Sequence, residues 1–136
     1  MTEIEVESES KMLELGASLV RAISQGDLVL FEGELGSGKT TLIRGMMQEL
    51  GWKEPVRSPT FNLFAVYPTD PPVLHADFYR ITSTLGTGVE DYLDSHLCLI
   101  EWPNAMLGHV DVEIAKWITI SFEGDGRRVQ LSNISL

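Results

Sequence analysis

A glycine-rich segment restricts the possible folds of this chain more than any other feature. Residues 33–40 read Gly-Glu-Leu-Gly-Ser-Gly-Lys-Thr and match G-x-x-x-x-G-K-[ST] at every fixed position. The apolar run 27–32 precedes the segment, and Leu42, Met46 and Leu50 follow it at helical spacing. A buried strand, a phosphate-binding turn and a helix in this order predict an α/β fold.

The chemistry of a triphosphate explains these residue types at this spacing. Glycines let successive backbone N–H groups point inward, and the N-terminus of the following helix adds positive partial charge. Lys39 then reaches the β- and γ-phosphates, the Thr40 hydroxyl binds Mg²⁺, and Thr41 can hydrogen-bond the α-phosphate. The candidate phosphate-binding residues are Gly36, Ser37, Gly38, Lys39, Thr40 and Thr41.

The remaining patterns predict strand–helix units followed by a hairpin. Ser8 or Ser10 can cap a helix that runs to Gly26, and two prolines predict a loop at 52–60. Expected strands are 3–7, 27–32, 61–67, 73–77, 97–101, 117–122 and 127–131. We therefore expect a single P-loop ATPase domain over residues 1–136, an NTPase-like three-layer α/β sandwich with a mixed central sheet.

A second Mg²⁺ ligand is expected to be a carboxylate at the end of a neighbouring apolar strand. Glu101 ends the run Leu-Cys-Leu-Ile and is the preferred candidate. Asp77, which ends His-Ala-Asp, is the alternative candidate. It is less favoured than Glu101, because the residues before it are less apolar. We assign the metal to Thr40 and Glu101, and give Asp77 the role of orienting water or supporting the metal ligands.

The segment that follows the P-loop by about 20 residues is a candidate nucleotide-sensing switch. It reads Arg57-Ser-Pro-Thr-Phe61, in which the Thr60 hydroxyl can approach Mg²⁺ or the γ-phosphate. Ser-Pro-Thr is also ordinary loop chemistry, so the residues alone leave both readings open.

The charge balance limits the partners of the chain. Twenty acidic and ten basic residues give a net charge of −10, which repels phosphate backbones and argues against independent nucleic-acid binding. The longest apolar run has five residues, far below the ~20 needed to span a membrane. The N-terminus lacks a basic-then-apolar leader, and the single cysteine forms no internal disulfide. These features predict a cytoplasmic protein without membrane contact.

Four motifs together resemble one family. They are the P-loop through Thr41, Ser58-Pro-Thr-Phe61, His75-Ala-Asp-Phe-Tyr-Arg80 and Leu99-Ile-Glu-Trp-Pro103. Their order and spacing are similar to those of the TsaE (formerly YjeE) family, over about residues 8–131. That family is the small bacterial ATPase of tRNA threonylcarbamoyladenosine biosynthesis.

The resemblance implies a Mg²⁺-dependent ATPase that acts with the TsaB and TsaD proteins on adenosine 37 of tRNA. The chain would then meet tRNA only indirectly, through the complex. The resemblance also implies ATP and Mg²⁺ as cofactors and catalytic or switch roles for Lys39, Thr60, Asp77 and Glu101. Residues near Ser8 and Glu9 would flank the base, together with Arg127 or Arg128 from the last hairpin.

Two other functions fit a P-loop. A small-molecule or nucleotide kinase needs a substrate pocket and an arginine-bearing lid, for which ten basic residues leave little material. A nucleotide-gated binding module with negligible hydrolysis overlaps with the ATPase interpretation, and turnover with and without a partner separates the two. A GTPase is disfavoured because no Asn-Lys-x-Asp signature occurs in the chain.

Overall fold

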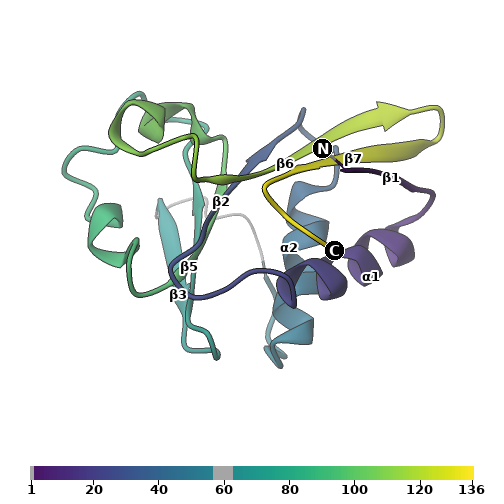
Figure 1. The fold of residues 1–136 in the computed structure, drawn as a ribbon, viewed down its shortest axis with the longest axis horizontal. Helices are drawn as coiled ribbons and strands as arrows, with labels where there is room; N and C mark the ends of the chain where they lie inside the picture. Colours follow the sequence, from purple (N-terminus) through teal and green to yellow (C-terminus); the bar gives the residue numbers. More distant parts are fainter. Residues whose placement is uncertain (1, 57–62) are drawn as a thin grey trace.

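A seven-stranded mixed sheet forms the centre of the molecule (Figure 1). The computed structural model describes residues 2–56 and 63–136. The strand order across the sheet is β1-β7-β6-β2-β5-β4-β3. The strands are β1 (Thr2–Val6), β2 (Leu28–Glu32), β3 (Phe64–Tyr67), β4 (Val73–Asp77), β5 (Leu97–Glu101), β6 (Lys116–Glu123) and β7 (Gly126–Ser132).

The sheet has a parallel centre and antiparallel margins. Strands β6, β2, β5 and β4 run parallel, with β5 paired to both β2 and β4. The hairpin β6–β7 and the pairs β1–β7 and β3–β4 are antiparallel. Parallel strands buried on both faces need continuous apolar sequences, which explains the run at 97–101. Parallel pairing also brings the carboxyl ends of β2, β5 and β4 to one edge.

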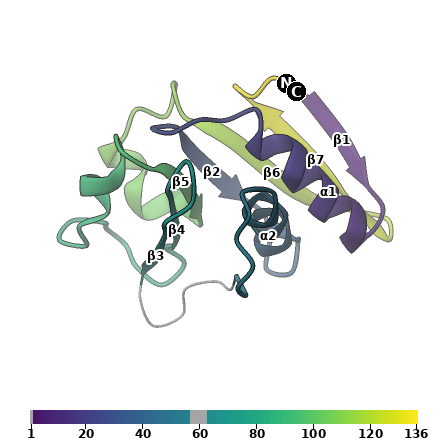
Figure 2. The ribbon, with the colours of Figure 1, turned by 90° about the horizontal axis from the view of Figure 1, so that it is seen from below.

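Helical segments cover both faces of this sheet (Figure 2). Helices α1 (Glu9–Val20) and α2 (Lys39–Glu49) pack on one face over a core that includes Phe31 and Leu99. The 3₁₀ helices η1 (Val89–Tyr92) and η2 (Pro103–His109) lie on the other, over Leu30 and Ile100. The predicted three-layer α/β sandwich is therefore confirmed. Within residues 2–56 and 63–136, no helix is long and apolar enough to cross a membrane.

The boundaries of two predicted elements were wrong. The first helix ends at Val20 rather than near Gly26, and a turn follows in which the Ala22 backbone donates a 2.9 Å hydrogen bond to the Leu19 carbonyl oxygen. The Asp27 carboxylate then accepts a 2.8 Å hydrogen bond from the Ser24 backbone and holds a second turn. Strand β3 begins at Phe64, after a bend at Leu63, whereas residues 61–62 of the predicted strand lie outside the described residues. The helix η2 was not predicted.

The crossing of α1 and α2 depends on two glycines. A Cβ added to Gly16 would lie 2.3 Å from the carbonyl oxygen of Leu42, and one added to Gly45 would lie 2.3 Å from that of Leu13. Each helix therefore places its glycine against the backbone of the other helix. This close approach fixes α2, and with it the loop that precedes α2.

Gly45→Ala should destabilise the fold by about 1–3 kcal/mol, because the added methyl group cannot fit against the backbone of α1. The intrinsic helix preference for alanine over glycine opposes this loss, so a measured loss reports the packing. Urea denaturation measures the effect. The control is Gly108→Ala, where a Cβ meets nothing within 4 Å and the change should stay within about 0.5 kcal/mol. Equal stability of the two variants would contradict the packing argument.

Candidate functional site

The turn between β2 and α2, residues 33–38, is the candidate phosphate loop, and glycines set its backbone. Gly38 caps α2 at its N-terminus with φ +113°, a conformation that residues with a side chain rarely adopt. At Gly33, an added Cβ would lie 2.6 Å from the Ser37 hydroxyl and 2.7 Å from the Ile120 carbonyl oxygen. Gly33 therefore packs closely against Ser37 of the same loop and against strand β6. Neither Gly33 nor Gly38 can carry a side chain without a change in the loop backbone.

Lys39 lies inside the site rather than on the surface. Its Nζ donates a hydrogen bond to the carbonyl oxygen of Gly33 and lies 3.6 Å from the centroid of the Trp102 ring. Burial lowers the pKa of Lys39, and the nearby carboxylates of Glu101 and Asp77 oppose this shift. The ammonium is therefore partly desolvated and has acidic groups beside it, as suits a lysine that meets an anionic ligand.

Thr40 and Glu101 meet at the first turn of α2. The Thr40 hydroxyl lies 3.2 Å from Oε1 and 3.4 Å from Oε2 of Glu101, whose side chain is almost fully buried. Two oxygens in neighbouring positions of a Mg²⁺ octahedron lie about 2.9 Å apart, because each bond is 2.0–2.1 Å. The hydroxyl and the carboxylate therefore fit Mg²⁺ in both donor chemistry and spacing.

Asp77 lies beside Glu101 because β4 and β5 end together. The two residues are register partners in the parallel pair, so both side chains project from the sheet on the α2 side. Asp77 Oδ1 accepts a 2.9 Å hydrogen bond from the Tyr79 backbone. Burial raises the pKa of Asp77, the Tyr79 bond opposes the shift, and the Glu101 charge adds to it.

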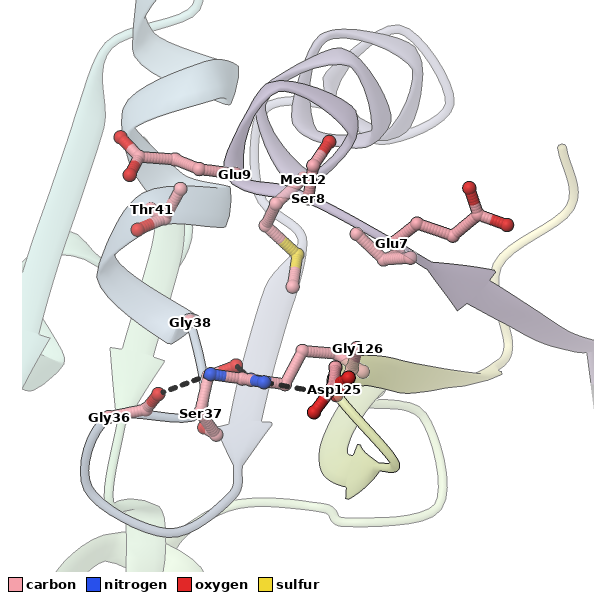
Figure 3. A pocket seen from close by; sticks show the side chains of 12 residues that line it. Glu7, Ser8, Glu9, Met12, Gly36, Ser37, Gly38, Thr41, Asp125 and Gly126 are labelled. Atoms are coloured by element: carbon pink, nitrogen blue, oxygen red, sulfur yellow. Dashed lines mark hydrogen bonds between the residues drawn. The ribbon is translucent and has the colours of Figure 1, made fainter.

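Two pockets flank the phosphate loop, each of about 290 Å³. One lies on the side of the candidate metal ligands and is lined by Leu35, Lys39, Thr40, Asp77, Glu101 and Trp102. The other lies toward α1 and the hairpin and is lined by Ser8, Glu9, Met12, Asp125, Gly126 and Arg127 (Figure 3). Both share Gly36, Ser37, Gly38 and Thr41. The loop thus joins one continuous candidate site.

The second pocket contains the predicted base-flanking residues. Ser8 caps α1 by accepting a 3.1 Å hydrogen bond from the Lys11 backbone. Glu9 forms a 2.6 Å ion pair with Arg44 of α2, which ties the two helices at the pocket rim. In Figure 3, Met12 points from α1 toward Gly38, whereas Glu7 points away.

The structure separates the two arginines that the sequence left open. The Arg127 guanidinium donates to the carbonyl oxygens of Ser37 (3.1 Å) and Gly36 (3.3 Å), so it holds the phosphate loop from the hairpin. Arg128 instead pairs with Glu123 at 3.0 Å, away from both pockets. Of the two arginines, Arg127 is therefore the one that contacts the glycine-rich loop and lines the second pocket.

The sequence assigned no role to two side chains near Glu101. Trp102, with φ +53°, places its ring against Lys39. The Nε2 of His75 lies 2.6 Å from Glu101 Oε2. The signal that points to it is strand parity, since His75 and Asp77 share a face two residues apart. Thr60, the predicted switch residue, lies outside the described residues.

Two comparisons with known proteins identify the family, and a third concerns the fold alone. Residues 6–130 match the family model described as "Threonylcarbamoyl adenosine biosynthesis protein TsaE". The chain belongs to the TsaE family. The resemblance predicted from the four motifs is confirmed.

Relatives from distant bacteria cover most of the chain, and each is described as a tRNA threonylcarbamoyladenosine biosynthesis protein TsaE. The protein of Streptomyces coelicolor is 41% identical over 99 residues, which are 67% of this chain and 66% of that protein. The Nostoc protein is 33% identical over 91% of this chain and 82% of its own length. The Borreliella burgdorferi protein is 32% identical over 95% and 98%, respectively.

A solved structure supports the fold. The structure described as "Crystal structure of Bacillus subtilus YdiB" has a TM-score of 0.84 to this chain. The match covers 98% of this chain and 86% of that chain at 23% sequence identity. The mixed sheet and its helices are therefore an architecture already observed by crystallography.

Arg127→Met should loosen the phosphate loop and lower the free energy of unfolding by about 1–2 kcal/mol, because two hydrogen bonds from a charged donor are lost. Arg128→Met is the matched control. Its partners are surface carboxylates, so its loss should stay below about 1 kcal/mol. Thermal unfolding of both variants measures the difference, and an equal or reversed order would refute the assignment of Arg127 to the loop.

Proposed function

We propose that this chain is a Mg²⁺-dependent ATPase that serves tRNA N6-threonylcarbamoyladenosine modification together with the TsaB and TsaD proteins. The observation that carries the proposal is the contact of Thr40 with Glu101, at 3.2 Å, beside a complete phosphate loop. Membership of the TsaE family supplies the pathway. The single cysteine is buried, and burial raises its pKa to about 12, so this thiol is not a reactive nucleophile.

In the pocket that contains Lys39, Thr40 and Glu101, different residues would hold the phosphates and the metal ion. The backbone N–H groups of the loop and the Lys39 ammonium would hold the phosphates. Thr40 and Glu101 would hold Mg²⁺, which neutralises charge on the phosphate oxygens when it is bound. The two protein ligands suit Mg²⁺, because this ion takes most of its remaining ligands from phosphates and water.

Asp77 is the candidate for orienting the attacking water. It lines the same pocket as Lys39 and Glu101, and its Oδ1 is fixed by the Tyr79 backbone. Burial raises the pKa of this carboxyl, which makes the ionised form a better proton acceptor than an exposed aspartate. We assign it the positioning of water and the acceptance of a proton, and leave Mg²⁺ to Glu101.

The second pocket would receive the adenosine part of ATP. It adjoins the loop through Gly36–Gly38 and Thr41, so a bound nucleotide can extend from one pocket into the other. Ser8 and Glu9 at the start of α1 and Arg127 from the hairpin would flank the base. Arg127 would also stabilise the loop conformation through its hydrogen bond to the Ser37 carbonyl oxygen.

The energy of hydrolysis would pass to another protein rather than to tRNA directly. A net charge of −10 opposes independent binding of tRNA, so contact through TsaD and TsaB is the simpler route. The predicted relay is the segment around Thr60, whose order can depend on the γ-phosphate as in switch loops of other P-loop proteins.

Lys39→Ala should lower ATP hydrolysis by about a hundredfold or more, because the positive charge on the phosphates is lost. The fold should survive, since burial already disfavours the charged form of this lysine. Steady-state ATPase assays of the chain with its partners measure the effect. Lys11→Ala, an exposed lysine paired with Glu14, is the control and should hydrolyse at the normal rate. Unchanged hydrolysis by Lys39→Ala would exclude the phosphate-loop assignment.

Nucleotide should change the affinity for TsaD by about fivefold or more, since a relay that senses the γ-phosphate couples the two binding events. Titrations of TsaD with ADP, a non-hydrolysable ATP analogue and no nucleotide measure this coupling. Thr60→Ala should weaken the coupling more than it weakens nucleotide binding, whereas the exposed Thr82→Ala should change neither. Identical affinities in the three nucleotide states, or rapid phosphorylation of a small molecule by the chain alone, would contradict the proposal.

A further inference from the structure

His75 is a fully buried polar residue that the mechanism above does not use. It occupies the middle of β4, where its register partners are Leu99 on β5 and Ala65 on β3. Its face of the sheet also carries Val73, which belongs to the apolar core under the helices. An imidazole placed among such groups costs free energy unless it makes a strong hydrogen bond. The only hydrogen-bond partner that the structure gives it, within the described residues, is Glu101.

Both oxygens of Glu101 lie near the Thr40 hydroxyl, but only Oε2 is bonded to His75. Oε2 lies 2.6 Å from His75 Nε2, whereas Oε1 is the oxygen nearer to the Thr40 hydroxyl, at 3.2 Å. A carboxylate held at one oxygen can no longer rotate freely about its last bond. The histidine therefore fixes the plane of the carboxylate and leaves Oε1, the oxygen that it does not bind, beside Thr40.

The tautomer of His75 follows from its surroundings. Nε2 must carry a proton in order to donate to the carboxylate. Nδ1 is buried and has no hydrogen-bond partner among the described residues. A bare Nδ1 leaves only an acceptor lone pair unsatisfied, whereas a protonated Nδ1 would bury an N–H without an acceptor. The Nε2–H form is the one that these contacts favour.

We propose that His75 is a positioning residue that orients the Glu101 carboxylate for Mg²⁺. The inference rests on the proposed function, because it takes Glu101 as the metal ligand. Outer groups that hydrogen-bond a ligating carboxylate set its direction, and their removal commonly costs tenfold to hundredfold in metal affinity. The role needs no change in the charge of the ring.

The experiment measures how much Mg²⁺ strengthens nucleotide binding. Calorimetry with a non-hydrolysable ATP analogue, in Mg²⁺ and in excess chelator, gives a ratio of two affinities for each variant. His75→Met removes the donor at similar volume and should lower this ratio by about tenfold or more. His75→Gln can still donate to Glu101 and should recover most of the ratio. Binding in chelator should stay unchanged in both variants, because neither touches the phosphate loop.

A double-mutant cycle shows whether His75 acts through Glu101. In a Glu101→Gln background, His75→Met should lower the ratio no further. If Glu101→Gln alone leaves the ratio unchanged, the metal assignment and the proposed function built on it fail. If Glu101→Gln lowers the ratio but His75→Met does not, only the positioning role is overturned. An additive effect of the two changes would also overturn it.

NMR of the nitrogen-15-labelled wild-type protein provides a test that needs no variant. The ring of His75 should show a protonated Nε2 and a bare Nδ1, and its nitrogen signals should shift when Mg²⁺ joins the analogue-bound protein. A histidine that serves only the core would keep its signals on Mg²⁺ addition. The Nδ1–H tautomer, or signals that do not respond to Mg²⁺, would refute the proposal even if His75→Met fails to fold.

Discussion

The parallel pairing of β2, β5 and β4 is the constraint on which the candidate site depends. Because these strands run in the same direction, their carboxyl ends meet at one edge of the sheet. The phosphate loop leaves β2 there, Glu101 ends β5 and Asp77 ends β4. No one of these strands holds a complete site, but their alignment brings a loop and two carboxylates within one pocket.

The arrangement of the candidate site provides local positive potential in an acidic protein. The chain carries a net charge of −10, yet its site would hold a polyanion next to two carboxylates. Backbone N–H groups and the N-terminus of α2 supply positive potential without adding ionisable side chains. Lys39 adds the one ammonium in that pocket lining, and its burial makes the charge more effective at short range. In the proposed ATPase, a divalent cation would offset the negative charge of the phosphates and of the two carboxylates, Glu101 and Asp77.

The sequence predicted the parts of the fold that depend on local patterns. The glycine loop, the apolar strands and the acid at the end of β5 are contiguous motifs, so their positions were close to those observed. The end of α1 was missed because Ile23 continues the apolar spacing and is buried in the same core, although the chain has already left the helix at Val20. The helix η2 was missed because its 3₁₀ geometry gives no regular apolar period.

Contacts between residues on different strands could not be predicted from such local patterns. The bond between His75 and Glu101 depends on the register of β4 against β5, which a single strand does not encode. The same is true of Arg127, which reaches the loop across about 90 residues of chain while its neighbour Arg128 turns to Glu123. The sequence alone does not show which of two adjacent arginines points toward the loop. Adjacent residues of a strand point to opposite faces of the sheet, so the register of the strand decides between them.

The parallel and antiparallel halves of the mixed sheet contribute different residues to one candidate site. The parallel half presents the loop, Lys39, Glu101 and Asp77, the groups suited to phosphate and metal. The antiparallel half, together with the start of α1, encloses the second pocket and sends Arg127 back to the loop. The carbonyl groups of Gly36 and Ser37 accept the Arg127 hydrogen bonds, and both residues line both pockets. In the proposed ATPase, the loop that binds the phosphates would therefore be held in shape by a residue that also lines the nucleoside pocket.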